Sequence, residues 1–281
     1  MDPVRRALPV KLRAGAAALL LCGTITAVTT GPTGAGAQIR PDPVADAIKA
    51  SAAPGSGWTP DPAAYGHKLV TGVRVPMSDG VQLAANVDYP TDPATGQIAP
   101  GAFPVLLTMT PYGKDTGQQA GLGTDDYLVQ RGYVDVVVDV RGTGASGGTF
   151  DLFDPKQATD GVRLVNWAAA LAHSDGKVGL HGASYLGIDQ MLTAGAVGKN
   201  SPLKAIFPIV TANDVYRDTA FMGGIPDLSF DAVYLAALLP VLNLLNPLVS
   251  ATVQPSTLLQ AITGLLTHAK GVLDYNAMFL L

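Results

Sequence analysis

The stretch that decides the fold is Val178-Gly-Leu-His-Gly-Ala-Ser-Tyr-Leu-Gly187. A short apolar strand pattern runs into glycine, alanine and serine, and a helical pattern begins at once. This order is typical of a nucleophile elbow, a tight turn that holds a serine hydroxyl above the end of a sheet. The small residues that flank Ser184 allow such a turn to close. The common pattern has its second glycine two residues after the serine, whereas this sequence has Leu186 there and the glycine at Gly187.

Two interpretations of Ser184 remain open on this stretch alone. As a nucleophile, it would stand at the positive end of the following helix, where the amide of Tyr185 can donate to a developing oxyanion. As a structural residue, it would be an ordinary serine that caps a helix at a glycine-rich junction.

The segments around the elbow alternate between strand and helix patterns. Residues 70–75 and 81–89 alternate in polarity on either side of a Ser-Asp-Gly turn, which predicts a hairpin. Further strands are predicted at 103–110, 133–140, 178–181 and 205–210, and helices at 125–131, 159–172 and 185–197. A hairpin followed by strands that alternate with helices predicts an α/β fold with a mostly parallel sheet.

Composition limits the function classes. The chain has 281 residues, of which 48% are hydrophobic and 14% charged, with a net charge of −4. These values argue against a disordered chain and against a nucleic-acid-binding protein. All 22 acidic residues are aspartate. The absence of glutamate excludes an HExxH zinc protease, a paired-glutamate glycosidase and an EF-hand closed by glutamate.

The first 37 residues have the pattern of a secretory signal peptide. Four basic residues precede an apolar run at 16–28, and small residues follow up to Ala37, so we expect cleavage between Ala37 and Gln38 and secretion. The only cysteine, Cys22, lies inside this segment. The secreted chain would therefore have no disulfide and no cysteine-based metal site, and we predict neither a cofactor nor a metal. Residues 38–66 are rich in Pro, Ala, Gly and Asp, which indicates a linker before a core at 67–225.

Residues 226–281 form an apolar C-terminal segment. Between 232 and 269 there is no Asp, Lys or Arg, but three prolines interrupt the run. The prolines favour several short packed helices over a membrane span. Such helices would suit a cap over a site or a surface for another protein. The sequence does not indicate an oligomeric state.

A second glycine-rich segment, Gly142-Thr-Gly-Ala-Ser-Gly147, matches the G-x-G-x-x-G pattern of dinucleotide sites. In such a site a helix opens immediately after the glycines. Here Thr149-Phe-Asp-Leu-Phe-Asp-Pro155 intervenes, so we interpret the segment as a structural turn.

Several segments in this order carry a family resemblance. They are Val73-Arg-Val-Pro-Met-Ser-Asp-Gly-Val-Gln-Leu83, Thr110-Pro-Tyr-Gly-Lys114, Asp139-Val-Arg-Gly-Thr-Gly-Ala-Ser146, Ser174-Asp-Gly-Lys-Val-Gly179, His181-Gly-Ala-Ser-Tyr-Leu-Gly187 and Asn213-Asp-Val-Tyr-Arg-Asp218. With them, residues 68–225 resemble the family that joins cocaine-esterase-type acyl esterases to X-Pro dipeptidyl-peptidases, whose elbow has this same G-x-S-Y-x-G form. The resemblance implies an α/β-hydrolase fold with a helical cap inserted after the sixth strand, incomplete at its C-terminus here. It also implies a serine hydrolase for small esters, or for short peptides with Pro or Ala second from the N-terminus.

The resemblance assigns roles to three residues. Ser184 would attack the scissile carbonyl, while the amide of Tyr185 and the phenolic hydroxyl of Tyr112 would stabilise the oxyanion. Without the resemblance, Tyr112 would be interpreted as an ordinary loop aromatic.

The base and the orienting acid that a serine nucleophile needs are harder to place. Of the four histidines, His67 lies at the very start of the core, His173 lies in a loop, and His181 lies on the elbow strand, where we expect local bonding. Only His268 follows Ser184. A triad within this chain would combine Ser184 and His268 with one of Asp214, Asp218, Asp227 or Asp231.

The resemblance places the aspartate and histidine elsewhere, on strands beyond Leu281, so we expect a truncated form. The open alternatives are a catalytic partner from another chain, an inactive remnant, and an exported non-enzymatic binding protein that uses the apolar segment.

Overall fold

A computed structural model describes residues 60–116 and 124–227, with Tyr234, Leu238, Leu242, residues 245–248, Ser250, Ile262 and Thr263. The chain divides into two units at Asp61, and everything below concerns the second unit, which begins at Pro62. The predicted signal peptide, residues 38–59 of the predicted linker, most of the predicted cap, Asp231 and His268 lie outside the described residues.

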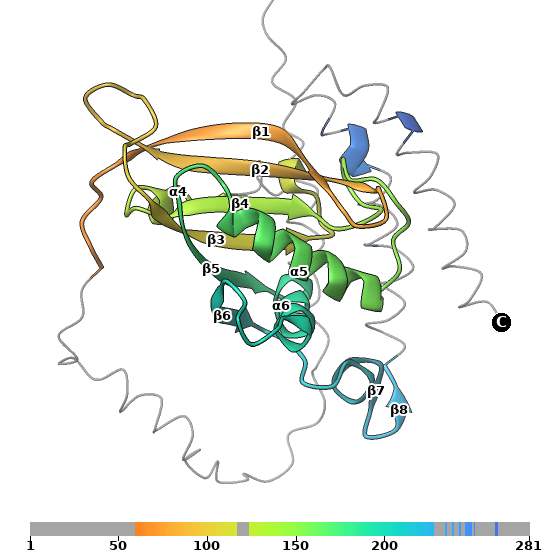
Figure 1. The fold of residues 1–281 in the computed structure, drawn as a ribbon. Helices are drawn as coiled ribbons and strands as arrows, with labels where there is room; N and C mark the ends of the chain where they lie inside the picture. Colours follow the sequence, from red (N-terminus) through yellow and green to blue (C-terminus); the bar gives the residue numbers. More distant parts are fainter. Residues whose placement is uncertain are drawn as a thin grey trace, which may run out of the picture. The chain divides into compact units, whose positions relative to one another are not determined.

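Within the described ranges, six strands form one mixed sheet in the order β1-β2-β4-β3-β5-β6 (Figure 1). The strands are β1 (Gly66–Pro76), β2 (Gln82–Thr91), β3 (Phe103–Thr110), β4 (Val134–Asp139), β5 (Ser174–Ala183) and β6 (Leu203–Ile209). β1 pairs antiparallel with β2, and β2 antiparallel with β4. The pairs of β3 with β4, β3 with β5 and β5 with β6 are parallel. The predicted hairpin and mostly parallel sheet are therefore confirmed.

Helices connect the strands. They are α4 (Asp126–Val129), α5 (Pro155–Ala169) and α6 (Tyr185–Ala196), followed by the π-helical turn η1 (Tyr216–Ala220) and the short strands β7 (Phe221–Met222) and β8 (Ile225–Pro226). In Figure 1, α5 and α6 lie side by side in front of the sheet, and both contact β3 and β5.

Several predicted boundaries differ from the structure by one to four residues, and two of these differences have a clear local cause. α5 begins at Pro155 rather than 159, because the Asp154 side chain accepts the amide of Lys156 as an N-cap and proline fits the first helical position. β5 begins at Ser174 rather than 178, since its first residues pair with β3 through the backbone and need no apolar side chains. In both cases local backbone bonding extends an element beyond its apolar pattern.

The two faces of the sheet differ in chemistry. Successive side chains of a strand point to opposite faces, and the even-numbered valines of β4, 134 to 138, belong to the hydrophobic core beneath α5 and α6. Asp135 and Asp139 of the same strand therefore point to the opposite face, and both are buried. This polar face carries the groups that organise the candidate active site.

No helix in the described part of the chain is both long and apolar enough to cross a membrane.

Candidate active site

Ser184 occupies the turn between β5 and α6. Its backbone has φ 63° and ψ −126°, a region that non-glycine residues rarely adopt. Its amide donates to the carbonyl of Ile209 on β6, at 2.9 Å, which holds the turn against the sheet. Among the described residues, its side chain makes no capping hydrogen bond to α6, and the residue is exposed. The geometry is that of a nucleophile elbow and not of an ordinary capping serine.

Two glycines make this turn possible. A Cβ on Gly182, which has φ 142°, would lie 2.6 Å from the Cβ of Leu186. A Cβ on Gly187 would lie 3.0 Å from the carbonyl oxygen of Ile209. The glycine three residues after the serine is therefore the one that allows α6 to approach β6.

Tyr112 stands beside the serine. Its hydroxyl lies 3.2 Å from Ser184 Oγ, and its amide donates to Thr110 Oγ1 at 3.0 Å. The structure thus brings together two residues that the sequence singled out from separate loops.

Tyr234 is a site residue that the sequence did not indicate. Its hydroxyl lies 3.1 Å from that of Tyr112, and burial raises the pKa of Tyr234 above its usual value. It lies in the Leu-rich segment, where nothing in the pattern distinguishes a tyrosine that faces a site from one that packs.

The Tyr185 side chain packs in the core and fixes the start of α6 there. It is 1% exposed, its hydroxyl donates to Gln157 Oε1 at 2.6 Å, and its ring stacks on Phe153 with centroids 4.6 Å apart. Its hydroxyl is therefore engaged away from Ser184, while its ring packs edge-on to Tyr112 with centroids 6.4 Å apart. What remains at the site is its amide, at the positive end of α6.

Asp139, at the end of β4, ties two loops together. One carboxylate oxygen accepts the amide of Lys114, at 2.6 Å, in the loop that carries Tyr112. The other accepts the amide of Ala145, at 2.9 Å, in the glycine-rich loop. Burial raises the pKa of Asp139 to about 6, while the positive charge of Lys114 and the two amides act in the opposite direction.

The glycine-rich segment at 142–147 is a structural turn. Gly142 and Gly144 have positive φ, and a Cβ on Gly144 would overlap the Asp139 carboxylate. The next helix begins only at Pro155. The loop therefore closes on its own aspartate and leaves no helix end for a pyrophosphate.

The described histidines have partners away from Ser184. His181 Nε2 lies 3.5 Å from Asp135 Oδ1, as the sequence led us to expect of a locally bonded side chain. His67 Nδ1 lies 3.1 Å from Asp88 Oδ2, and the His173 ring packs edge-on to Tyr89. Within the described ranges, no histidine hydrogen-bonds to Ser184.

The candidate acids that can be placed serve local turns. Asp218 accepts the amides of Asn213 and Asp214, both at 2.9 Å, and Asp214 accepts those of Tyr216 and Arg217. The amide of Asp227 donates to the carbonyl of Ala220 at 3.0 Å.

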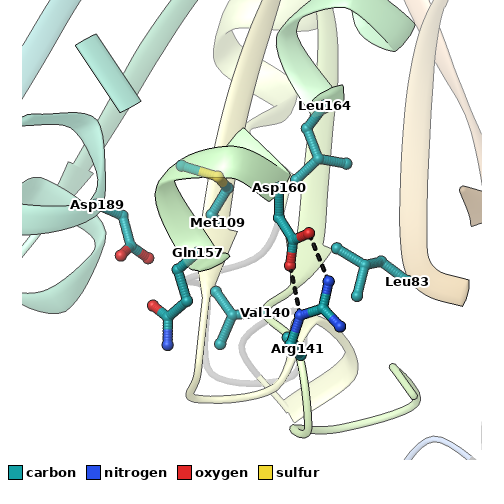
Figure 2. Close-up of a pocket in the computed structure, with 8 residues that line it drawn as sticks. All are labelled: Leu83, Met109, Val140, Arg141, Gln157, Asp160, Leu164 and Asp189. Carbon is teal, nitrogen blue, oxygen red and sulfur yellow. Dashed lines mark hydrogen bonds and ion pairs between the residues drawn. The ribbon is translucent and has the colours of Figure 1, made fainter. Parts of the chain in front are cut away.

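Asp189 was not indicated by the sequence either. It lies on α6, one turn and a half beyond the serine, and lines a cavity of about 10 Å³ together with Met109, Arg141 and Gln157 (Figure 2). Arg141, across that cavity, is already paired with Asp160 through two hydrogen bonds of 2.7 and 2.8 Å. In the part of the chain that the structure describes, neither oxygen of Asp189 has a hydrogen-bond partner, and burial raises its pKa well above the usual value.

Comparison with known proteins gives one consistent picture. Residues 79–243 match the family model described as X-Pro dipeptidyl-peptidase (S15 family). The cocaine esterase of Rhodococcus sp. (strain MB1 Bresler) is 36% identical over 153 residues, which cover 54% of this chain and 25% of that protein. The chain therefore spans about a quarter of that relative's length.

Two crystal structures of a CocE/NonD family hydrolase from Staphylococcus aureus share the fold. One has 32% identity and a TM-score of 0.52 over 60% of this chain and 32% of that one. The other has 28% identity and a TM-score of 0.55 over 66% and 36%. The predicted α/β-hydrolase fold is confirmed.

Proposed function

Because the chain belongs to the X-Pro dipeptidyl-peptidase (S15) family, we propose that it is a serine hydrolase that cleaves ester or peptide bonds through an acyl-enzyme on Ser184. The single observation that carries this proposal is the strained, exposed Ser184 with the Tyr112 hydroxyl 3.2 Å from its Oγ. A nucleophile and an oxyanion donor are the two groups that acyl transfer needs at the carbonyl.

The chemistry follows from these positions. Ser184 Oγ attacks the carbonyl carbon, and the Tyr112 hydroxyl and the Tyr185 amide donate to the oxygen that becomes negative. The bond to the leaving alcohol or amine then breaks, and that group takes up the proton that the serine lost. Water hydrolyses the acyl-enzyme and restores the serine hydroxyl.

The proton on Ser184 must pass through a base, which we place outside the described residues. His268 is the only histidine of this sequence that follows Ser184, and it is the candidate within the chain. The competing source is a strand that adds to the sheet beside β6, the last strand of the sheet within the described ranges. Two side chains near the end of β6, Phe207 and Val210, are 66% and 82% exposed, which suits an added element.

A burst assay tests the proposal. We expect p-nitrophenyl acetate to release p-nitrophenol in a burst of about one equivalent per chain, and Ser184→Ala to abolish it. An alanyl-prolyl p-nitroanilide assay distinguishes a peptidase from an esterase. A folded wild-type chain that gives no burst would overturn the enzymatic function.

The rival function is a non-enzymatic exported protein that binds partners through its apolar surface. The exposed apolar residues at the end of β6 favour it, as does the Leu-rich segment. The same burst separates the two, since a binding protein has no need of an activated serine.

Secretion is part of the proposal. The basic and apolar segments before Ala37 support export and cleavage. N-terminal sequencing of the protein from culture medium should begin at Gln38, and a mature chain that retains its first residues would contradict cleavage.

A further inference from the structure

A second group of chemistry-bearing residues lies far from Ser184. His67 lies at the start of β1, Asp88 near the end of β2, and Asp126 at the start of α4. Asp88 pairs in register with Asp135, near the amino end of β4, whereas Ser184 follows the carboxyl end of the parallel strand β5. The group therefore lies near the amino ends of the parallel strands, whereas the nucleophile lies at their carboxyl ends.

The three side chains converge on one point. Their ligand atoms lie within 4.8 Å of one another. His67 Nδ1 is 3.1 Å from Asp88 Oδ2 and 3.7 Å from Asp126 Oδ1. The hydroxyl of Thr124 lies 3.5 Å from Asp88 Oδ2, which brings a further oxygen to the same place.

The buried carboxyl of Asp88 has only part of its hydrogen bonds satisfied. The Asp88 side chain is 1% exposed, and within the described ranges its Oδ1 has no hydrogen-bond partner. The group therefore sets two carboxylates against one imidazole, and an unsatisfied buried oxygen costs free energy.

We propose that His67, Asp88 and Asp126 bind one zinc ion, which joins the β1–β2 hairpin to α4. Zinc binds imidazole nitrogen and carboxylate oxygen at about 2.0–2.2 Å, so two of its ligands lie roughly 3.0–3.6 Å apart. The distance of 3.1 Å lies within that range, and the distance of 3.7 Å is 0.1 Å above it. An ion on Asp88 Oδ2 is also within reach of Oδ1, because a carboxylate can bind one cation with both oxygens.

The donor set favours zinc over the alkaline-earth ions. An imidazole ligand suits zinc and its neighbours in the periodic table, whereas calcium and magnesium prefer oxygen ligands alone. Asp126 is 53% exposed and His67 42%, so an ion can enter from solvent and keep water as its remaining ligands. This site could not be predicted from the sequence, because its ligands are separated by 21 and 38 positions and match no spacing motif.

Calorimetric titration of the untagged chain at pH 7 tests the proposal. We expect one zinc ion per chain, and weaker binding of calcium and magnesium. Saturation at a hundredfold excess over Kd should raise the midpoint of thermal unfolding by about 5 to 10 °C, because the ion binds only the folded site.

Variants locate the ion. Asp126→Asn and His67→Gln should each weaken zinc binding at least tenfold and reduce the thermal shift to about half or less. Asp126 is the safer change, since its side chain is half exposed. Asp151→Asn, at another exposed aspartate, is the matched control and should bind zinc as the wild type does.

Three results would overturn the proposal: no saturable zinc binding, zinc binding that both variants leave unchanged, or calcium or magnesium binding as tightly as zinc. None of these readouts depends on catalytic activity.

Discussion

The hydroxyl of Tyr112 lies 3.2 Å from Ser184 Oγ although the two residues are 72 positions apart in the sequence. The sheet explains this proximity. Tyr112 follows the carboxyl end of β3, and Ser184 follows that of β5, which is its parallel neighbour. Loops that follow adjacent parallel strands lie next to each other at the carboxyl ends of those strands, which is where α/β proteins bind their ligands.

Removal of the Tyr112 hydroxyl should impair acylation. We expect Tyr112→Phe to slow the p-nitrophenyl ester burst by about 100-fold, the lower range for loss of an oxyanion donor. Stopped-flow absorbance measures the rate. Tyr127→Phe, at a half-exposed tyrosine of α4, is the control and should leave the rate unchanged. Equal rates for Tyr112→Phe and the wild type would exclude Tyr112 from the oxyanion site.

Tyr234 should act through Tyr112. Their hydroxyls lie 3.1 Å apart, so a proton donated by Tyr234 leaves that of Tyr112 available for the oxyanion. A single neutral hydrogen bond is worth about 0.5–1.5 kcal/mol, so Tyr234→Phe should slow acylation roughly threefold to tenfold. The double variant with Tyr112→Phe should be no slower than Tyr112→Phe alone. Additive effects would show that Tyr234 acts independently.

Much of this architecture could be predicted from local pattern. The alternation of 70–75 with 81–89 predicted the hairpin, and the strand, glycine and serine before Tyr185 predicted the elbow. These features are set by neighbours along the chain, so the sequence displays them directly.

Contacts across the fold could not be predicted in the same way. The carboxylate of Asp139 joins two loops through backbone amides, and backbone amides have no sequence signature. The pairing of Tyr112 with Tyr234 and the convergence of His67 on Asp126 depend on how distant segments pack. In β4, the repeated valines predicted a strand but concealed that both of its aspartates share one buried face.

Because the backbone at Ser184 is strained, a glycine there should raise the free energy of unfolding, although it removes the nucleophile. At φ 63° glycine relieves the strain, while alanine keeps it. We expect Ser184→Gly to have a free energy of unfolding about 1 kcal/mol above that of Ser184→Ala, with both variants giving no burst. Urea unfolding measures the difference. Equal stabilities would indicate that the turn is not strained.

The raised pKa of Asp139 predicts that the free energy of unfolding depends on pH. Its folded-state pKa of about 6 lies above the ordinary aspartate value of 3.8, so the folded protein holds this proton more tightly than the unfolded chain does. The resulting stabilisation is complete below about pH 4 and disappears as the pH rises through 6. Asp139→Asn, which has no such proton, should therefore be less stable than the wild type by a margin that narrows by about 2–3 kcal/mol between pH 4 and pH 7.

Urea unfolding across this range measures the margin, and a margin independent of pH would contradict the prediction. If the variant does not fold, carbon NMR of the Asp139 carboxyl in the wild type should show its titration near pH 6.

Gly144 and Gly176 provide a matched test of how the glycine-rich loop is built. Both have positive φ, 51° and 81°, so alanine is strained by about 1–2 kcal/mol at either position. A Cβ at Gly176 meets nothing within 4 Å, whereas at Gly144 it overlaps the Asp139 carboxylate. Gly144→Ala should therefore lose about 2 kcal/mol more than Gly176→Ala in urea unfolding, since the carboxylate must move away from the two amides that it accepts.

Gly144→Ala should also impair the active site. Asp139 holds the amide of Lys114, two residues after Tyr112, so its displacement shifts the loop that carries the oxyanion donor. We expect Gly144→Ala to slow the ester burst while Gly176→Ala leaves it unchanged. A Gly144→Ala protein that is destabilised but acylates at the wild-type rate would show that Asp139 supports the fold without positioning Tyr112.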